Sequence, residues 1–150
     1  MPTIWIDADA TPKVVREIIC KAAIRTATNA CFVANHRVPV TPSPHIRCVQ
    51  VEPGFDVADN LIAQQAQTGD LVITQDIPLA AEVMENKVAV INNRGETYSP
   101  QTIRQKLQMR DFMDTMRSSG IKSGGPAAFS DKDKQTFANA LDRWLAKARA

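Results

Sequence analysis

Short apolar segments alternate with helix-forming segments along this chain, and that alternation limits its fold more than any other feature. The apolar segments are 3–6, 30–34, 46–51, 71–74 and 88–91. Segments with helical spacing of apolar residues lie between them at about 12–27, 56–67 and 78–86. Strands that are apolar throughout are typical of parallel sheets covered by helices. The sequence therefore predicts an α/β fold, a three-layer α/β/α sandwich around a mostly parallel central sheet of about five strands.

Helix-start signals extend this pattern to the C-terminus. Thr11-Pro12 is a typical helix start, because threonine can cap a helix and proline suits its first position. Residues 99–118 and a segment from Ser130 onward also have the composition and spacing of helices. We expect one domain over residues 1–150, with the two C-terminal helices from about residue 99 packed on it.

Composition excludes several classes of protein. No apolar run approaches the roughly 20 residues that span a bilayer, and the N-terminus lacks the basic and apolar parts of a secretory signal. We therefore expect a soluble cytoplasmic protein without a membrane partner. Cys20, Cys31 and Cys48 lie far apart, which indicates reduced thiols rather than a zinc site. His36 and His45 fall in a proline-rich loop, where solvated side chains are expected.

Charge is unevenly distributed, although the net charge is only +2. Residues 1–50 carry six basic and three acidic side chains, and residues 87–150 carry twelve basic and six acidic ones. Residues 51–86 carry seven acidic side chains and no lysine or arginine. This acidic block is either a solvated face balanced by its neighbours or a source of carboxylates for a cation site with a basic rim.

Five aspartates are expected at one edge of the sheet. In open α/β sheets, ligands bind beyond the carboxyl ends of the strands, and the crossover helices begin at that same edge. Asp7 and Asp9 follow the first predicted strand, and Asp76 follows the fourth. Asp56 and Asp59 lie at the start of a predicted helix. The sequence therefore gathers these side chains into one candidate pocket.

Asp70 belongs to a different place. It precedes the apolar segment 71–74, so it is expected near the opposite edge of the sheet from Asp76. A strand rises about 3.3 Å per residue, which separates the two carboxylates by roughly 15–20 Å. We interpret Asp70 as a turn residue that acts together with Gly69.

A divalent cation would explain the predicted carboxylate cluster. Carboxylates within a few ångströms raise each other's pKa unless a cation lies between them. No histidine or cysteine accompanies them, and all-oxygen ligands suit Mg²⁺ or Mn²⁺ rather than Zn²⁺. The alternative is that the helix-start aspartates, Asp56 above all, only cap their helix and interact with its dipole.

Several polar residues are candidates for contacts with a phosphate or with RNA. Asn35 follows the second strand and Thr74 ends the fourth, so either can orient a phosphate or a water molecule. Arg94, in the loop after the fifth strand, and Arg104, on the following helix, are candidate phosphate contacts. Lys122 opens a glycine-rich stretch whose backbone N–H groups can bind an anion. Ordinary loop, linker and solvated-helix roles remain the alternatives.

Six stretches of the chain resemble the bacterial YaiI/YqxD family. They are IWIDADATP, GFDVADNLI, GDLVITQDIPLAAE, NNRGETYSP, MRDFMDTMRSSGI and GGPAAFSDKDKQTFANALDRWL. The resemblance covers nearly the whole chain. It implies a PIN-like fold, but the family has no established activity, so membership alone does not assign a function.

A more local resemblance is to PIN nucleases, in the stretch DNLIAQQAQTGDLVITQD. Position by position, Asp7 matches the aspartate of the first strand, Asp59 the one that opens a helix, and Thr74 with Asp76 a T-x-D at the end of the next strand. The resemblance implies that these acids hold Mg²⁺ or Mn²⁺ for cleavage of RNA. PIN enzymes usually add a glutamate from a helix between their first and fourth strands, and this chain has no acid between Glu17 and Glu52.

The stretch IDADAT also resembles the D-x-D-x-T start of haloacid-dehalogenase-type phosphatases. That resemblance implies Asp7 as nucleophile and Asp9 as general acid and base. Such enzymes also need a lysine before their second acidic motif. No lysine lies between Lys21 and Lys87 in this chain. The phosphatase interpretation is therefore the weaker one.

The leading hypothesis from the sequence is a metal-dependent, PIN-like nuclease that acts on RNA. Asp7, Asp59 and Asp76 would hold Mg²⁺ or Mn²⁺, and Asp9 and Asp56 would support them through water or as further ligands. The alternative hypothesis is a non-catalytic RNA- or nucleotide-binding module, and it rests on the glutamate that is absent from the expected helix.

Overall fold

The computed structural model describes residues 2–54, 57–118 and 129–149, with only the backbone course for 110–118 and 149. Asp56 and Lys122, both predicted to contribute to the site, lie outside these residues. The strands are β1 (Thr3–Asp7), β2 (Asn29–Ala34), β3 (Ile46–Gln50), β4 (Leu71–Ile73) and β5 (Ala89–Ile91). The helices are α1 (Lys13–Thr26), α2 (Val57–Gln65), α3 (Ile77–Met84), α4 (Pro100–Ser118) and α5 (Asp131–Arg149), with a short 3-10 helix, η1 (Ala8–Ala10).

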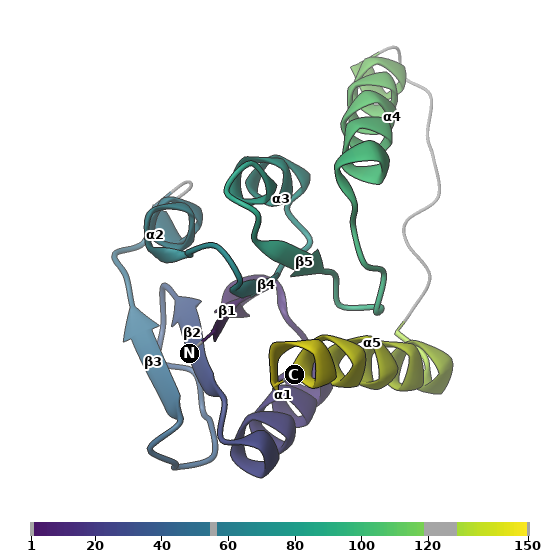
Figure 1. Ribbon diagram of the computed structural model, residues 1–150. Coiled ribbons are helices and arrows are strands. Elements are labelled where there is room, and N and C mark those ends of the chain that lie inside the picture. The colour runs from purple at the N-terminus through teal and green to yellow at the C-terminus, as the bar shows by residue number, and fades with distance from the viewer. Residues whose placement is uncertain (1, 55–56, 119–128, 150) are drawn as a thin grey trace.

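All five strands are parallel and form one sheet in the order β3-β2-β1-β4-β5. Helices α2 and α3 cover one face of the sheet, and α1 and α5 cover the other (Figure 1). This arrangement confirms the predicted three-layer α/β/α fold with a central sheet of five strands. Among the described residues, no helix is both long and apolar enough to cross a membrane.

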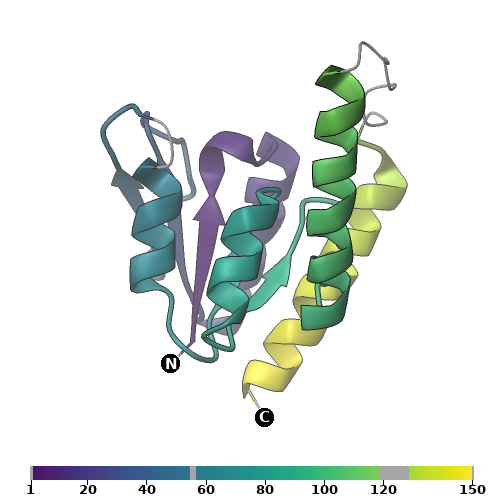
Figure 2. The same ribbon diagram turned by 90° about the horizontal axis from the view of Figure 1, so that it is seen from above.

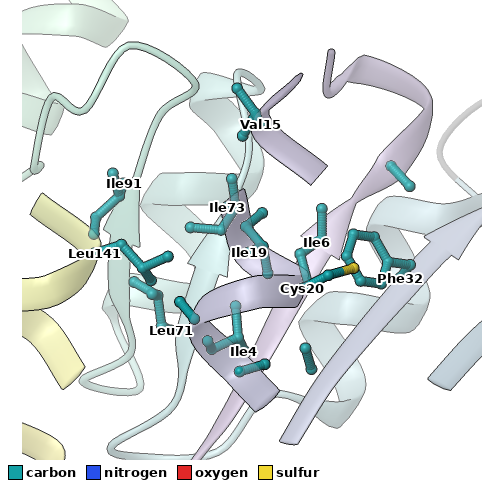
Figure 3. Packing of buried hydrophobic residues seen from close by; sticks show 14 of the residues in the cluster. Ile4, Ile6, Val15, Ile19, Cys20, Phe32, Leu71, Ile73, Ile91 and Leu141 are labelled. Carbon is teal, nitrogen blue, oxygen red and sulfur yellow. The ribbon is translucent and has the colours of Figure 1, made fainter. Parts of the chain in front are cut away.

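Side chains from both faces of the sheet are buried, which explains why the strands are apolar throughout. In β1, Ile4 and Ile6 point into the core beneath α1 and α5, where Ile19 and Leu141 pack near them (Figure 3). Trp5 points to the other face and joins a second cluster with residues of α2, α3 and α4. Successive strand residues alternate between faces, so a sheet covered on both sides requires an apolar residue at nearly every position.

The strand order creates a switch point between β1 and β4. From β1 the chain moves outward through β2 to β3, and then crosses by α2 to β4 and β5 on the other side. Connections leave β1 and β4 in opposite directions, and this divergence opens a crevice at the carboxyl ends of the strands. Ile6 pairs with Ile73, so the register places Asp7 beside Thr74. Figure 2 shows the end of β1 between α2 and α3.

Asp70 lies at the opposite, amino edge of the sheet and is buried. One of its carboxylate oxygens accepts a hydrogen bond from Thr3 N at 2.9 Å. The other accepts bonds from Trp5 Nε1 and Gln67 N, each at 3.0 Å. The expectation that Asp70 is a turn residue away from the candidate site is confirmed, and the carboxylate also ties the start of β1 to the turn before β4.

Gly95 allows the loop after β5 to lie directly against α5. Its φ is +86°, and a Cβ atom built there would lie 2.5 Å from the carbonyl carbon of Thr136. Gly69 has a similar φ of +94°, but a Cβ atom there would meet nothing within 4 Å. A side chain at either position would strain the backbone, but only one at position 95 would also clash with α5.

We expect Gly95→Ala to lower the free energy of unfolding more than Gly69→Ala does. Both substitutions place a side chain at positive φ, which costs about 1–2 kcal/mol. Only Gly95→Ala also forces α5 away from the loop, since the contact is with backbone atoms, and we expect this to cost at least about 1 kcal/mol more. Urea unfolding of both variants measures the difference, and equal losses would contradict a close approach of α5.

Candidate functional site

A cavity of about 610 Å³ lies at the switch point beyond the ends of β1 and β4. Its walls come from the end of β1, from η1, from the first turn of α2 and from α3. It is lined by Asp7, Asp9, Ala10, Gly54, Val57, Ala58, Asp59, Asn60, Asp76, Pro78, Leu79 and Glu82. Five of these side chains are carboxylates, and no lysine, arginine or histidine is among the described lining residues. We call this cavity the acidic pocket.

Asp7 is the most buried carboxylate of the acidic pocket, with 8% of its surface exposed. Its Oδ2 atom accepts a hydrogen bond of 3.2 Å from the Thr74 hydroxyl. Burial raises the pKa of the Asp7 carboxyl above its ordinary value, the Thr74 hydrogen bond lowers that pKa in part, and the charges of Asp9 and Asp76 raise it again. A cation in the pocket would reverse this balance and favour the ionised carboxylate.

Thr74 joins Asp7 to Asp76. Its side chain is fully buried, and its hydroxyl oxygen also accepts a 3.0 Å hydrogen bond from Asp76 N. The Asp76 carboxylate caps α3, because its Oδ1 atom accepts the Leu79 N–H at 2.9 Å. One threonine therefore fixes the positions of two aspartates at adjacent strand ends. The Thr74 hydroxyl therefore orients carboxylates, and its expected role toward a phosphate or a water molecule stays a prediction.

Asp9 is held by the end of β2. Its Oδ2 atom accepts the backbone N–H of Asn35 at 3.0 Å, and its Oδ1 atom lies 2.9 Å from His36 Nδ1. Asn35, expected to orient a phosphate or water, thus contacts the pocket through its backbone. His36 is exposed in the loop, as expected, and its ring also pairs with a carboxylate of the acidic pocket.

The segment that carries Asp9 is fixed by side chains from other elements. The Thr11 hydroxyl donates to the carbonyl oxygen of Asp7 at 2.7 Å and does not cap α1, whose N-cap is Pro12. The expectation that Thr11 caps this helix is therefore wrong. Asn93 Nδ2 donates to the carbonyl oxygen of Ala10 at 2.8 Å. These contacts set the course of η1, which the sequence did not predict.

Helix α2 contributes Asp59, in its first turn, and Asn60 to the acidic pocket. The expected grouping of Asp7, Asp9, Asp59 and Asp76 around one cavity is thus present in the structure. Asn60 was not singled out from the sequence, although it follows Asp59 directly and is close to the start of the same helix.

Glu82 is a fifth carboxylate of the acidic pocket that sequence reasoning missed. It is exposed on α3 and lies three residues after Leu79, another lining residue, which places both on one face of the helix. The signal in the sequence was the position of Glu82 on the helix that Asp76 begins, three residues after Leu79. The resemblance to PIN nucleases implies a glutamate between the first and fourth strands, whereas Glu82 follows the fourth strand.

A model of the family described as "Uncharacterized BCR, YaiI/YqxD family" matches residues 5–147. The chain belongs to the YaiI/YqxD family. This membership confirms the resemblance found in the sequence.

Similar proteins come from several bacteria. A UPF0178 protein of Aliivibrio salmonicida is 60% identical over 146 residues, which cover 97% of each chain. A UPF0178 protein of Pectobacterium carotovorum is 57% identical with the same coverage, and one of Proteus mirabilis is 58% identical over 95% of this chain and 94% of its own. No solved structure matches this chain. The names of these YaiI/YqxD relatives state no activity, ligand or partner.

The donors of the acidic pocket suit Mg²⁺ or Mn²⁺ in chemistry. All five charged lining groups are carboxylates, and hard divalent cations prefer oxygen ligands. Among the described residues, however, no three acidic, histidine or cysteine side chains already converge closely enough to hold a metal ion. The pocket therefore offers the right kind of ligand, and a bound ion would need water, backbone oxygen or small side-chain movements to complete its shell.

The arginines predicted to contact a phosphate lie away from the acidic pocket. Arg94 Nη1 forms an ion pair of 2.7 Å with Asp133 of α5 and ties the loop after β5 to that helix. Arg104 is exposed on α4, where its Nε lies 3.4 Å from the carbonyl oxygen of Pro100. Neither arginine is among the residues that line the acidic pocket.

Proposed function

We propose that this protein is a divalent-cation-dependent hydrolase that cleaves RNA phosphodiesters at the acidic pocket. One observation carries the proposal. Carboxylates from β1, η1, α2 and α3 line one cavity at the switch point of a parallel sheet, and no cationic side chain is among its described lining residues. RNA as the substrate is supported by the resemblance of the stretch around Asp59, Thr74 and Asp76 to PIN nucleases.

A cation is needed before an anionic substrate can enter such a pocket. A phosphodiester and five carboxylates repel one another, and burial strengthens that repulsion because the local dielectric constant falls. Asp7, Asp59 and Asp76 would hold Mg²⁺ or Mn²⁺, with support from Asp9 and from Asp56. Such an ion would supply charge neutralisation at the phosphate and a coordinated water of lowered pKa.

The protein's own residues prepare the pocket for this task. The Thr74 hydroxyl orients Asp7, and the Leu79 N–H orients Asp76, so neither carboxylate needs to reorganise when charge develops nearby. Burial of Asp7 at the end of β1 keeps bulk water away from one side of the site. Glu82 lines the pocket from α3 and is exposed, so it can accept a proton released at the pocket.

A non-catalytic RNA- or nucleotide-binding module remains the second candidate. It is favoured by the finding that no three described side chains already form a metal-binding group. A phosphatase of the haloacid-dehalogenase type is disfavoured. Asp70 and Asp76 would have to supply its second acidic motif, but Asp70 is engaged with Thr3 and Trp5 at the opposite edge of the sheet. No lysine is among the described residues of the acidic pocket.

The test is cleavage of labelled single-stranded RNA by purified protein in Mn²⁺, in Mg²⁺ and in EDTA. We expect metal-dependent cleavage that falls tenfold or more in Asp7→Asn and in Asp76→Asn, because each loses a charge in the pocket. Asp142→Asn is the matched control, because this exposed carboxylate pairs with Arg25 and is not among the described residues that line the acidic pocket. Cleavage unchanged in both pocket variants contradicts the proposal. RNA binding without cleavage in any divalent cation supports the second candidate.

A further inference from the structure

A second cavity, of about 360 Å³, lies beside the start of α1 on the face of the sheet opposite α2 and α3. It is lined by Lys13, Arg16, Glu17, Cys20, Pro39, Val40 and Thr41. The first four residues come from the first eight residues of α1, and the others come from the loop between β2 and β3. Two cationic side chains face one acidic side chain, so this cavity, which we call the basic pocket, has the opposite charge to the acidic pocket.

One short segment separates the two pockets. Asp9 and Ala10 line the acidic pocket, and Lys13, only three residues after Ala10, lines the basic pocket. Consecutive Cα atoms are 3.8 Å apart, so the Cα atoms of Ala10 and Lys13 are at most about 11 Å apart. The two pockets therefore adjoin the same short segment, and this closeness allows neighbouring parts of one polymer strand to reach both of them.

The cationic groups of the basic pocket are placed to receive an anion. Arg16 Nη1 donates to the carbonyl oxygen of Thr11 at 2.6 Å, which fixes the guanidinium next to η1 and reduces the entropy lost when it binds a ligand. Lys13 is exposed and is the first residue of α1. The helix has no side-chain cap, so its N-terminal dipole adds to the positive potential of these two residues.

We propose that Lys13 and Arg16 bind a backbone phosphate of the RNA strand, next to the phosphodiester that occupies the acidic pocket. This inference rests on the proposed function, because it assigns the flanking part of the same substrate. The two phosphates are held in different ways: the one in the acidic pocket needs a cation, whereas the flanking one meets cationic side chains directly. Phosphate contacts of this kind position a strand without reading its sequence.

The test measures binding of a labelled single-stranded RNA oligonucleotide by fluorescence anisotropy. The titrations are repeated over a range of salt concentrations, in Mn²⁺ and in EDTA. We expect Lys13→Gln to raise Kd three- to tenfold and to reduce the slope of log K against log salt by about 0.7, the value for one phosphate contact on a single strand. Lys21→Gln is the matched control, since Lys21 is exposed on the same helix and lines neither pocket.

Arg16→Gln provides a second variant, with a thermal melt to confirm folding because Arg16 also holds Thr11. Equal Kd and salt slope in Lys13→Gln and Lys21→Gln overturn the inference, as does a wild-type protein that binds no RNA at low salt. Competition by a mononucleotide as strong as that by the oligonucleotide also overturns it, because the basic pocket would then be a free-phosphate site. RNA binding that depends on Lys13 but is not accompanied by cleavage would contradict the proposed hydrolase. The same result would support the inference that Lys13 and Arg16 bind a phosphate of the RNA strand.

Discussion

Asp70→Ala is expected to lower the free energy of unfolding by roughly 3–5 kcal/mol. The substitution leaves three buried or half-buried donors, Thr3 N, Trp5 Nε1 and Gln67 N, without the carboxylate that accepts their hydrogen bonds. Each hydrogen bond to a charged group contributes about 1.5–3 kcal/mol, and an unsatisfied buried donor adds a penalty of its own. Urea or thermal unfolding measures the loss.

Asp70→Asn is expected to cause a smaller loss of stability than Asp70→Ala. An asparagine oxygen can still accept the Trp5 and Gln67 donors, but its amide nitrogen then faces the Thr3 N–H and cannot accept from it. We therefore expect a loss between that of Asp70→Ala and the wild type. Asp142→Ala, which removes one exposed ion pair with Arg25, is the control and is expected to change stability by less than about 1 kcal/mol. An Asp70→Ala loss as small as the control's would contradict an anchoring role for Asp70.

The elements of the fold were predictable because they depend on local patterns. Each predicted strand and helix is present with bounds shifted by no more than about two residues, and the apolar character of segments such as 71–74 follows from burial on both faces. The η1 turn was missed because no local signal specifies it. Its course depends on Thr11 and on Asn93, which is more than 80 residues away in the chain.

The candidate site was predictable only as far as the strand-end rule reaches. That rule places Asp7 and Asp76 at one edge, and the pairing of β1 with β4 then makes them neighbours. The same rule does not say which residues further along a helix point toward the pocket, so it does not predict Glu82. It also cannot tell a free arginine from a paired one, and the structure ties Arg94 to Asp133 on α5.

Asp7→Asn is expected to have opposite effects on stability without and with a divalent cation. Burial raises the pKa of Asp7, and the charges of Asp9 and Asp76 raise it further, so the ionised carboxylate destabilises the metal-free protein at neutral pH. Asparagine has nearly the same shape, can still accept the Thr74 hydroxyl and carries no charge. We expect the metal-free variant to be more stable than the wild type by about 1 kcal/mol, or about 2–4 °C in Tm at this chain length.

The pH dependence of stability tests whether the ionised Asp7 carboxylate destabilises the metal-free protein. The native protein binds the Asp7 proton more tightly than the unfolded chain does, so the Asp7 contribution to the free energy of unfolding falls as pH rises from the ordinary aspartate pKa near 3.8 through the raised value. The fall is complete above that raised pKa. Asp7→Asn removes this contribution, and Tm measured from pH 4 to pH 8 in EDTA should therefore fall less in the variant than in the wild type.

Addition of Mn²⁺ should reverse the order of the two proteins. A cation at 100 times its Kd stabilises the protein that binds it by about 2.7 kcal/mol, and Asp7→Asn removes one of the carboxylates proposed to hold it. Thermal melts with and without Mn²⁺ measure both effects. Glu85→Gln is the control that should follow the wild type, because Glu85 is exposed, lies three residues after Glu82 and is not among the described lining residues. Equal stabilisation of wild type and Asp7→Asn by Mn²⁺ would show that the ion binds elsewhere. If the metal-free variant is less stable than the wild type, Asp7 is a structural carboxylate, like Asp70. It would then not be a carboxylate that costs stability in the metal-free protein and serves to bind a cation.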